Sequence, residues 1–155
     1  MTRIKDIQEC VRGILEEMPE DRKRYSAAAH LNGVSLAVVM IAKKRGLDPE
    51  LAAIAGLMHD LHAYQSGSYS DHTRLGAKLA RGILEKLDVT TAEENDIICS
   101  AIEHHDDKAA ADGPMDEVLK DADVIHHSLS DPTKPVKEHE QARYEKLCEE
   151  FGMKL

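Results

Sequence analysis

Apolar residues recur at spacings of three and four along almost the whole chain, and no segment shows the strict alternation of a half-buried β-strand. Leucine, isoleucine, valine, alanine and methionine supply nearly all of this pattern, because the chain has no tryptophan, one phenylalanine and four tyrosines. Such residues favour packed helices, whereas β-sandwiches are seldom so poor in aromatic side chains. At 155 residues the chain is long enough to bury a substantial core. The sequence therefore predicts a single all-α domain.

Turn and capping signals divide this pattern into six to seven helices. Pro19 ends the first helix and Gly46 the second, while Asp48-Pro49 is a good N-cap and first-turn pair for the third. The run TAEE from Thr91 matches a capping box, and the polar run AYQSGSYSD from Ala63 predicts a loop. The expected helices span about residues 1–18, 21–45, 49–61, 71–87, 91–102, 115–129 and 136–151.

Acidic residues outnumber basic ones by 29 to 20, which gives a formal net charge of −9. This charge disfavours binding to nucleic acid, although a local cation can still reverse the field inside a pocket for a small phosphorylated ligand. The start of the chain lacks the apolar core of a signal peptide, and we expect no membrane span. The three cysteines form no CxxC pair, as is typical of reduced thiols. We therefore expect a cytoplasmic protein.

The placement of the nine histidines is informative. Four of them, on four separate predicted helices, lie three, four or seven residues from apolar positions: His30, His59, His72 and His105. Ionisable groups that face a core are costly unless they are paired or bound to a metal. One such histidine is more often a satisfied core residue, but four of them together with the adjacent Asp60 favour a shared metal centre. Neutral imidazoles and carboxylates suit first-row divalent metals.

The order of these residues resembles the H…HD…D signature of the HD-domain metal-dependent phosphohydrolases. His30 matches the first position, and His59-Asp60 matches the pair that names the family. Asp123 in DADVIHH matches the last position, rather than Asp121, for which we expect a solvated or supporting role. A His-Asp pair alone is a weak signal, but the ordered set is specific. The resemblance implies an HD-domain helical bundle that forms a single domain over residues 1–155. The resemblance itself covers about residues 24–130, and the terminal helices at 1–18 and 136–151 are additions to it.

Relatives with two metals carry two further histidines between the His-Asp pair and the last aspartate. His72 in SDHTRLGAKLAR and His105 in SAIEHHDD look like that pair, with His104 as the second choice. This arrangement is similar to the branch that includes the bacterial diadenosine tetraphosphate hydrolases. The resemblance thus implies two divalent metals per chain, iron, manganese or another first-row metal, with Asp60 as the bridge between them. The implied ligands are His30, His59, Asp60, His72, His105 and Asp123.

This chain departs from many family members after the His-Asp pair. They carry a lysine three residues after the aspartate, whereas HDLHAY has none. His62 is a candidate for contacting phosphate or donating a proton, and a surface histidine near a helix end is the alternative. Arg74, Lys78 and Lys108 are candidates for binding substrate phosphate, against the simpler interpretation of a solvated cationic face. The remaining histidines that follow the last aspartate are expected at the surface or in supporting roles: His126, His127 and His139.

The resemblance implies a phosphohydrolase that cleaves a phosphoester or phosphoanhydride of a small nucleotide-like molecule, using a metal-activated water. Two other functions remain open. Some HD relatives use a di-iron site and oxygen to cleave C–C or C–P bonds, and the same ligands permit this. The third possibility is a sensor that binds a nucleotide without turning it over. The sequence does not predict the oligomeric state.

Overall fold

The computed structural model of the chain describes residues 2–154, and every regular element in that range is a helix. The all-α class predicted from the sequence is therefore confirmed, and each of the expected helices is present. The elements in chain order are α1 (Arg3–Glu16), α2 (Asp21–Arg45), α3 (Pro49–Met58), α4 (Leu61–Ser66), α5 (His72–Leu87), α6 (Ala92–His104), α7 (Pro114–Leu129), the 3₁₀ helix η1 (Glu138–Glu140) and α8 (Gln141–Phe151).

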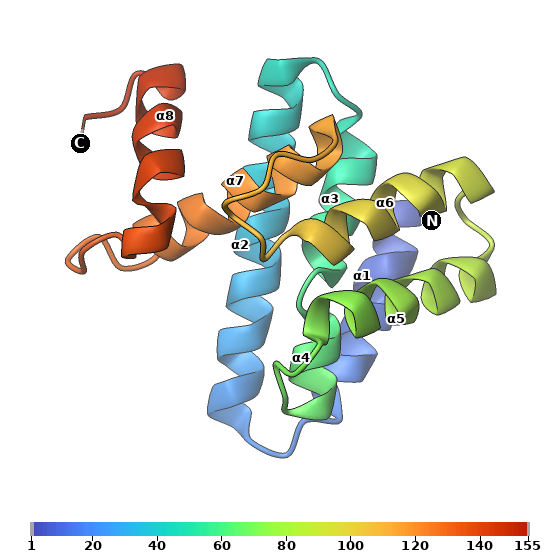
Figure 1. The fold of residues 1–155 in the computed structure, drawn as a ribbon. Coiled ribbons are helices and arrows are strands. Elements are labelled where there is room, and N and C mark those ends of the chain that lie inside the picture. The colour runs from blue at the N-terminus through green and yellow to red at the C-terminus, as the bar shows by residue number, and fades with distance from the viewer. Residues whose placement is uncertain (1, 155) are drawn as a thin grey trace.

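The long helix α2 stands at the centre of the molecule, and α3 and α7 pack along it (Figure 1). The neighbouring helices α5 and α6 lie to one side, where α6 also contacts α3 and α7. Helix α8 packs on α7 at the opposite side, and α1 packs against α3 and α2. Helices distant in sequence thus meet around the middle of α2, which is where the candidate site lies.

Helix α2 supplies one side of the core. Leu31, Val34, Val38 and Ile41 follow one another at spacings of three and four, and all are fully buried. Burying an aliphatic side chain of this size contributes about 1.5–3 kcal/mol, so this face fixes the position of α2 against α3 and α7.

Among the described helices, α2 alone is long and apolar enough to cross a membrane by length and composition. The sequence was expected to contain no such segment, since no stretch approaches about 18 consecutive apolar residues. The buried face of α2 packs against α3 and α7 as a core helix does. Length and composition alone are weak evidence for a membrane span, since core helices pass the same test.

Two of the predicted helix starts are confirmed in detail. The Asp48 carboxylate accepts hydrogen bonds from the N–H groups of Glu50 and Leu51, at 2.8 and 3.1 Å. Thr91 and Glu94 form the reciprocal capping box at the start of α6, with distances of 2.9 and 3.2 Å. Asp71 holds the N-cap position of α5 without a capping hydrogen bond.

The segment after α3 differs from its prediction. Residues 61–66 form the short helix α4, where the sequence predicted an end to α3 followed by a loop from Ala63. Asp60 separates the two helices with φ −108° and ψ 7°, in the sparsely populated bridge region. The polar sequence did not indicate α4, because a six-residue helix is too short for a periodic apolar pattern. Packing against α5 and α1 stabilises it instead.

Candidate metal centre

Four of the six predicted ligands sit where helices end or begin. His59 follows the last residue of α3, Asp60 precedes α4, His72 opens α5, and His105 follows the last residue of α6. Residues at helix ends can turn towards a common point, because the chain changes direction there.

The other two predicted ligands come from helix interiors. His30 lies in the middle of α2, and Asp123 lies in α7, which packs directly on α2. Gly56 in α3 lets His30 and His59 approach each other, because a Cβ at position 56 would lie 2.8 Å from the Cα of Ser35 in α2. The ring atoms Nε2 of His30 and His59 are 3.0 Å apart.

Backbone carbonyl groups fix the tautomers of three histidines. The Nδ1 atoms of His59, His72 and His105 lie 2.8, 2.9 and 2.7 Å from carbonyl oxygens three residues earlier in the chain. A carbonyl oxygen only accepts, so each Nδ1 carries the proton and donates it. The neutral ring then presents the lone pair of Nε2, which is the atom that faces the other ligands.

Asp60 lies between two groups of imidazoles. Its Oδ2 is 3.4 Å from Nε2 of His30 and 3.5 Å from Nε2 of His59. Its Oδ1 is 3.2 Å from Nε2 of His105 and 3.5 Å from Nε2 of His72. Oδ1 is buried and has no hydrogen-bond partner within residues 2–154. Each oxygen thus faces a different pair of nitrogen donors, which is the arrangement that a carboxylate bridging two cations requires.

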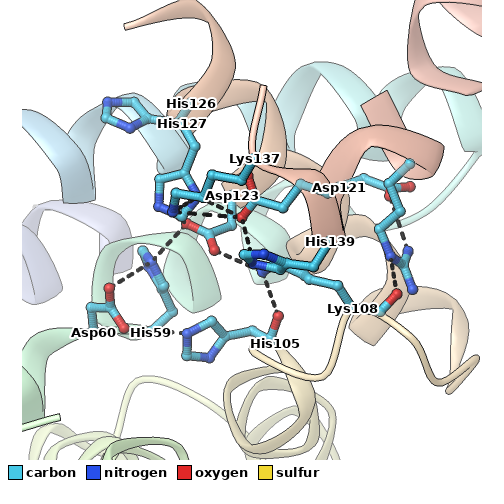
Figure 2. A network of polar contacts seen from close by, with 12 residues as sticks. His59, Asp60, His105, Lys108, Asp121, Asp123, His126, His127, Lys137 and His139 are labelled. Carbon is cyan, nitrogen blue, oxygen red and sulfur yellow. Dashed lines mark hydrogen bonds and ion pairs between the residues drawn. The ribbon is translucent and has the colours of Figure 1, made fainter. Parts of the chain in front are cut away.

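Asp123 lies next to His30 and His59 and belongs to the same group of donor atoms. Its buried Oδ1 lies 3.4 Å from Nε2 of His30 and 3.7 Å from Nε2 of His59, and it lacks a hydrogen-bond partner within the described range. Its Oδ2 accepts a hydrogen bond from Nζ of Lys108 at 2.7 Å. Lys108 also donates to the carbonyl of His105 at 2.6 Å, as Figure 2 shows. Lys108 therefore ties two of the predicted ligands together.

The surroundings keep both carboxyl groups ionised. Burial alone would raise the pKa of Asp60, but the adjacent imidazoles of His59, His105 and His30 hold that pKa well below its usual range. Burial would likewise raise the pKa of Asp123, and the adjacent His59 imidazole and the charge of Lys108 lower it instead. Burial lowers the pKa of His59, which favours its neutral form.

The residues present fit first-row divalent metals. The nearest donor atoms of Asp60, His72 and His105 all lie within 4.8 Å of one another, and so do those of His30, His59 and Asp60. Neutral imidazoles with ionised carboxylates are the donors that such metals prefer. The unpartnered Oδ1 of Asp60 lies beside His72 and His105, and the unpartnered Oδ1 of Asp123 lies beside His30 and His59. A cation in each group would satisfy the carboxylate oxygen there.

A cavity of about 710 Å³ opens onto these ligands. Besides His30, Asp60, His72, His105 and Asp123, its lining includes Tyr64, Tyr69, His126, His127 and Lys137. Its size is within the range of pockets that hold small organic ligands. Polar and aromatic groups at its rim can therefore meet a small molecule bound next to the metal ligands.

Other residues predicted for the site lie elsewhere in the structure. His104 is half-exposed and its Nδ1 lies 3.3 Å from Asp116, away from the cluster that His105 joins. His62 and Lys78 line a separate, largely apolar cavity between α1, α4 and α5. Arg74 is exposed and pairs with Asp71. The roles of these residues in catalysis and substrate binding stay predictions.

Asp121, expected to be solvated or to support the site, is buried and lies away from the predicted ligands. Its carboxylate pairs with Arg45 at 2.7 Å and with Arg143 at 3.1 Å, at a distance from the imidazole groups. Asp123, two residues later, points to the opposite side of α7, towards His30 and His59. The separation of the two aspartates follows from the 100° turn per residue of the helix.

Two histidines that the sequence analysis assigned to the surface or to supporting roles lie against the ligands. Nδ1 of His126 is 2.9 Å from Nδ1 of His30. Nε2 of His127 is 3.4 Å from Oδ1 of Asp123. The signal for His127 was present in the sequence, because it follows Asp123 by four residues and so shares a face of α7 with it.

Comparison with known proteins identifies the fold. The family model described as HD domain matches residues 27–128. Among solved structures, the chain is similar to the crystal structure of a predicted HD superfamily hydrolase from an uncultured Thermotogales bacterium. That match has a TM-score of 0.62 and 22% identity, and it covers 93% of this chain and 88% of the other. A comparison with curated proteins found no match. The family match covers most of the chain and includes every predicted metal ligand, so the protein belongs to the HD-domain family.

Proposed function

We propose that this protein is a metal-dependent phosphohydrolase that cleaves a phosphoester or phosphoanhydride bond in a small nucleotide-like molecule. The observation that carries the proposal is the position of Asp60. Its two oxygens face two different pairs of imidazole nitrogens at 3.2–3.5 Å, which supports a site for two cations with Asp60 as their bridge. The proposed ligands are His30, His59, Asp60, His72, His105 and Asp123.

When bound there, two first-row divalent ions would lower the pKa of a water molecule towards neutrality and polarise a phosphoryl group. The side chains of this protein supply the geometry for that chemistry. Carbonyl groups hold the rings of His59, His72 and His105 with Nε2 towards the site. Lys108 holds Asp123 through its Oδ2 and leaves Oδ1 free to face the site.

The cavity beside the ligands supports a substrate of nucleotide size. Tyr64 and Tyr69 line it and offer aromatic faces, while Lys137 brings a cation to its rim. A lysine at this place can contact a phosphate group. Many family members use for this purpose a lysine three residues after the aspartate of the His-Asp pair, which this chain lacks. The net charge of −9 supports a small substrate rather than nucleic acid, and a cytoplasmic location is part of the same proposal.

Chromatographic detection of nucleotide products and of inorganic phosphate, with a panel of nucleoside phosphates and dinucleoside polyphosphates as substrates, tests the proposal. The protein loaded with Mn²⁺ or Fe²⁺ is compared with its Asp60→Asn and Asp96→Asn variants. Asp60→Asn keeps the size of the side chain but removes the charge of the bridge, so we expect turnover to fall at least about 1,000-fold. Asp96 is exposed in α6 and pairs only with Arg81 in the described structure, so Asp96→Asn should retain full activity.

Three results would count against the proposal. Full turnover by Asp60→Asn would exclude this mechanism. Oxygen consumption that depends on iron, without phosphate release, would favour the di-iron oxygenase instead. Nucleotide binding by the metal-loaded protein without any turnover would favour a sensor.

A further inference from the structure

His127 lies next to the predicted metal ligands, on the same face of α7 as Asp123. Its Nε2 lies 3.4 Å from Oδ1 of Asp123, and its ring stacks on that of His30 with centroids 5.5 Å apart and planes 12° from parallel. Figure 2 shows His127 directed towards Asp123 from one turn further along the helix. His127 therefore faces the same point as His30 and Asp123.

Glu140 in η1 holds the other side of the His127 ring. Its Oε1 lies 2.9 Å from Nδ1 of His127, and the residue is 1% exposed. Nζ of Lys137 and Nε2 of His139 lie 3.8 and 3.7 Å from the same oxygen, and Nζ of Lys137 also lies 3.2 Å from Nδ1 of His127. The carboxylate oxygen of Glu140 is the closer partner of Nδ1 and can only accept, so Nδ1 of His127 carries a proton and donates to Glu140.

The hydrogen bond from Nδ1 of His127 to Glu140 determines whether Nε2 of the same ring can donate or accept. With the proton on Nδ1, a neutral His127 presents the lone pair of Nε2. That lone pair faces Oδ1 of Asp123, a buried oxygen without a hydrogen-bond partner in the described range. Two acceptors that face each other at 3.4 Å repel unless a proton or a metal cation lies between them. The same geometry, with carbonyl groups in place of the carboxylate, holds His59, His72 and His105.

We propose that His127 is a further ligand of the metal ion held by His30 and Asp123, and that Glu140 is the residue that positions it. The donor atoms of His30, Asp123 and His127 all lie within 4.8 Å of one another. A carboxylate that accepts from the distal nitrogen of a metal-bound histidine is a recurring arrangement. The inference rests on the metal centre proposed above.

With Glu140 as the residue that positions His127, the C-terminal segment takes part in metal binding. The family match ends at residue 128, so Glu140 lies outside the matched region, while His127 lies at its edge. The segment from 131 to 140 returns to α7 and places Glu140 against His127. The added C-terminal part of this chain thus completes the metal site rather than only extending the bundle.

The affinity of the metal-free full-length protein for Co²⁺, measured by competition with a chromophoric chelator, tests the inference. His127→Ala should weaken binding of one Co²⁺ by at least about 100-fold, and Glu140→Gln by about tenfold, since loss of such a supporting carboxylate lowers affinity by about 10–100-fold. Glu138→Gln is the matched control, because Glu138 is exposed and lies on the same 3₁₀ helix as Glu140. Its affinity should equal that of the wild type.

A second readout separates metal ligation from a structural role. In proton NMR spectra of the Co²⁺-loaded protein, each coordinated imidazole contributes one strongly shifted, exchangeable N–H signal. His127→Ala should remove one of these signals, and Glu140→Gln should move one of them. The Glu140→Gln variant keeps the packing of the side chain, so it tests the inference even where His127→Ala fails to fold.

The outcomes distinguish the two proposals. A wild-type protein that binds no Co²⁺ would contradict the metal centre itself. A wild-type protein that binds Co²⁺, together with a folded His127→Ala variant of the same affinity and spectrum, would overturn only the role of His127. If that variant binds Co²⁺ normally but turns over substrate more slowly, His127 is a proton donor and the inference is again wrong.

Discussion

Asp60 and Asp123 meet the imidazoles through oxygen atoms that no other described group satisfies. Burying such an oxygen without a partner costs about 1–3 kcal/mol, and more when the group is charged. The protein keeps one such oxygen in each of the two groups of imidazoles, and hydrogen bonds on the far side of the His59, His72 and His105 rings set the direction of their Nε2 atoms. At the scale of single residues, the site is therefore built to be completed by cations.

Glu117 in α7 gives a prediction about acid stability. Partial burial alone would raise its pKa, but hydrogen bonds from Arg143, from the N–H of Asp112 and from Lys120 lower it to about 2. Because the folded-state pKa lies below the unfolded value of 4.5, the carboxylate stabilises the fold above pH 4.5, and this contribution disappears as the pH falls towards 2. We expect Glu117→Gln to lower the free energy of unfolding by about 1 kcal/mol at pH 7, and by much less at pH 3.

Urea unfolding of both proteins between pH 3 and pH 7 measures this difference. Glu149→Gln is the control, because Glu149 is exposed on α8 and its substitution should leave the pH profile unchanged. A difference between Glu117→Gln and wild type that stays constant across this range would contradict the role assigned to the Glu117 carboxylate.

Individual site residues could be predicted from the sequence where helical spacing and the ordered family pattern agree. These two signals selected the six residues that the structure brings together. They could not separate His104 from His105, because the choice depends on how α6 ends: His105 donates Nδ1–H to the Ile102 carbonyl and turns inward. They also could not reveal Glu140, which reaches His127 through tertiary packing.

Contacts between helices set the distances within the site. Gly56 in α3 sits against the backbone of α2, where a Cβ would lie 2.8 Å from Cα and 3.0 Å from N of Ser35. Backbone atoms cannot move aside as a flexible side chain can. The close approach of α2 and α3 therefore depends on this glycine, and the 3.0 Å separation between the rings of His30 and His59 depends on that approach.

Gly56→Ala is expected to push α3 away from α2. We predict a decrease of about 1–3 kcal/mol in the free energy of unfolding, as overpacking in a close-packed core typically gives. Gly82→Ala in α5 is the matched control, since a Cβ there meets nothing within 4 Å. Alanine has the higher helix propensity, so Gly82→Ala should stabilise by about 0.5–1 kcal/mol. Thermal and urea unfolding measure both variants, and stabilisation by both would show that the α2–α3 contact is not tight.

Helices with clear periodicity and caps could be predicted from the sequence. The capping box at Thr91 and the N-cap at Asp48 fixed two helix starts, and Gly46 ends α2 with a positive φ of 72°. Helix α4 could not be predicted, because it is too short to carry a periodic pattern. The helix predicted at 136–151 is divided into the 3₁₀ helix η1 and α8, which begins at Gln141. Both short elements border the cavity: Tyr64 comes from α4, and Lys137 directly precedes η1.

The whole molecule places residues from five α-helices and a 3₁₀ helix around one point. The C-terminal helix is joined to this arrangement by Arg143 in α8, which donates to Glu117 and Asp121 of α7 and to the carbonyls of Lys108 and Ala110. Lys108 in turn donates to Asp123. The all-α fold and its family could be predicted from the sequence, but this link between α8 and the metal ligands follows only from tertiary structure.

Ligands that come from separate helices link metal binding to the stability of the whole fold. The most direct measurement is therefore the metal content per chain, by elemental mass spectrometry, of untagged protein purified without chelator and after reconstitution with Fe²⁺, Mn²⁺ or Zn²⁺. We predict about two first-row metal ions per chain, with a melting temperature that rises on loading. A protein that holds no metal after reconstitution, with an unchanged melting temperature, would contradict the metal centre on which the proposed function depends.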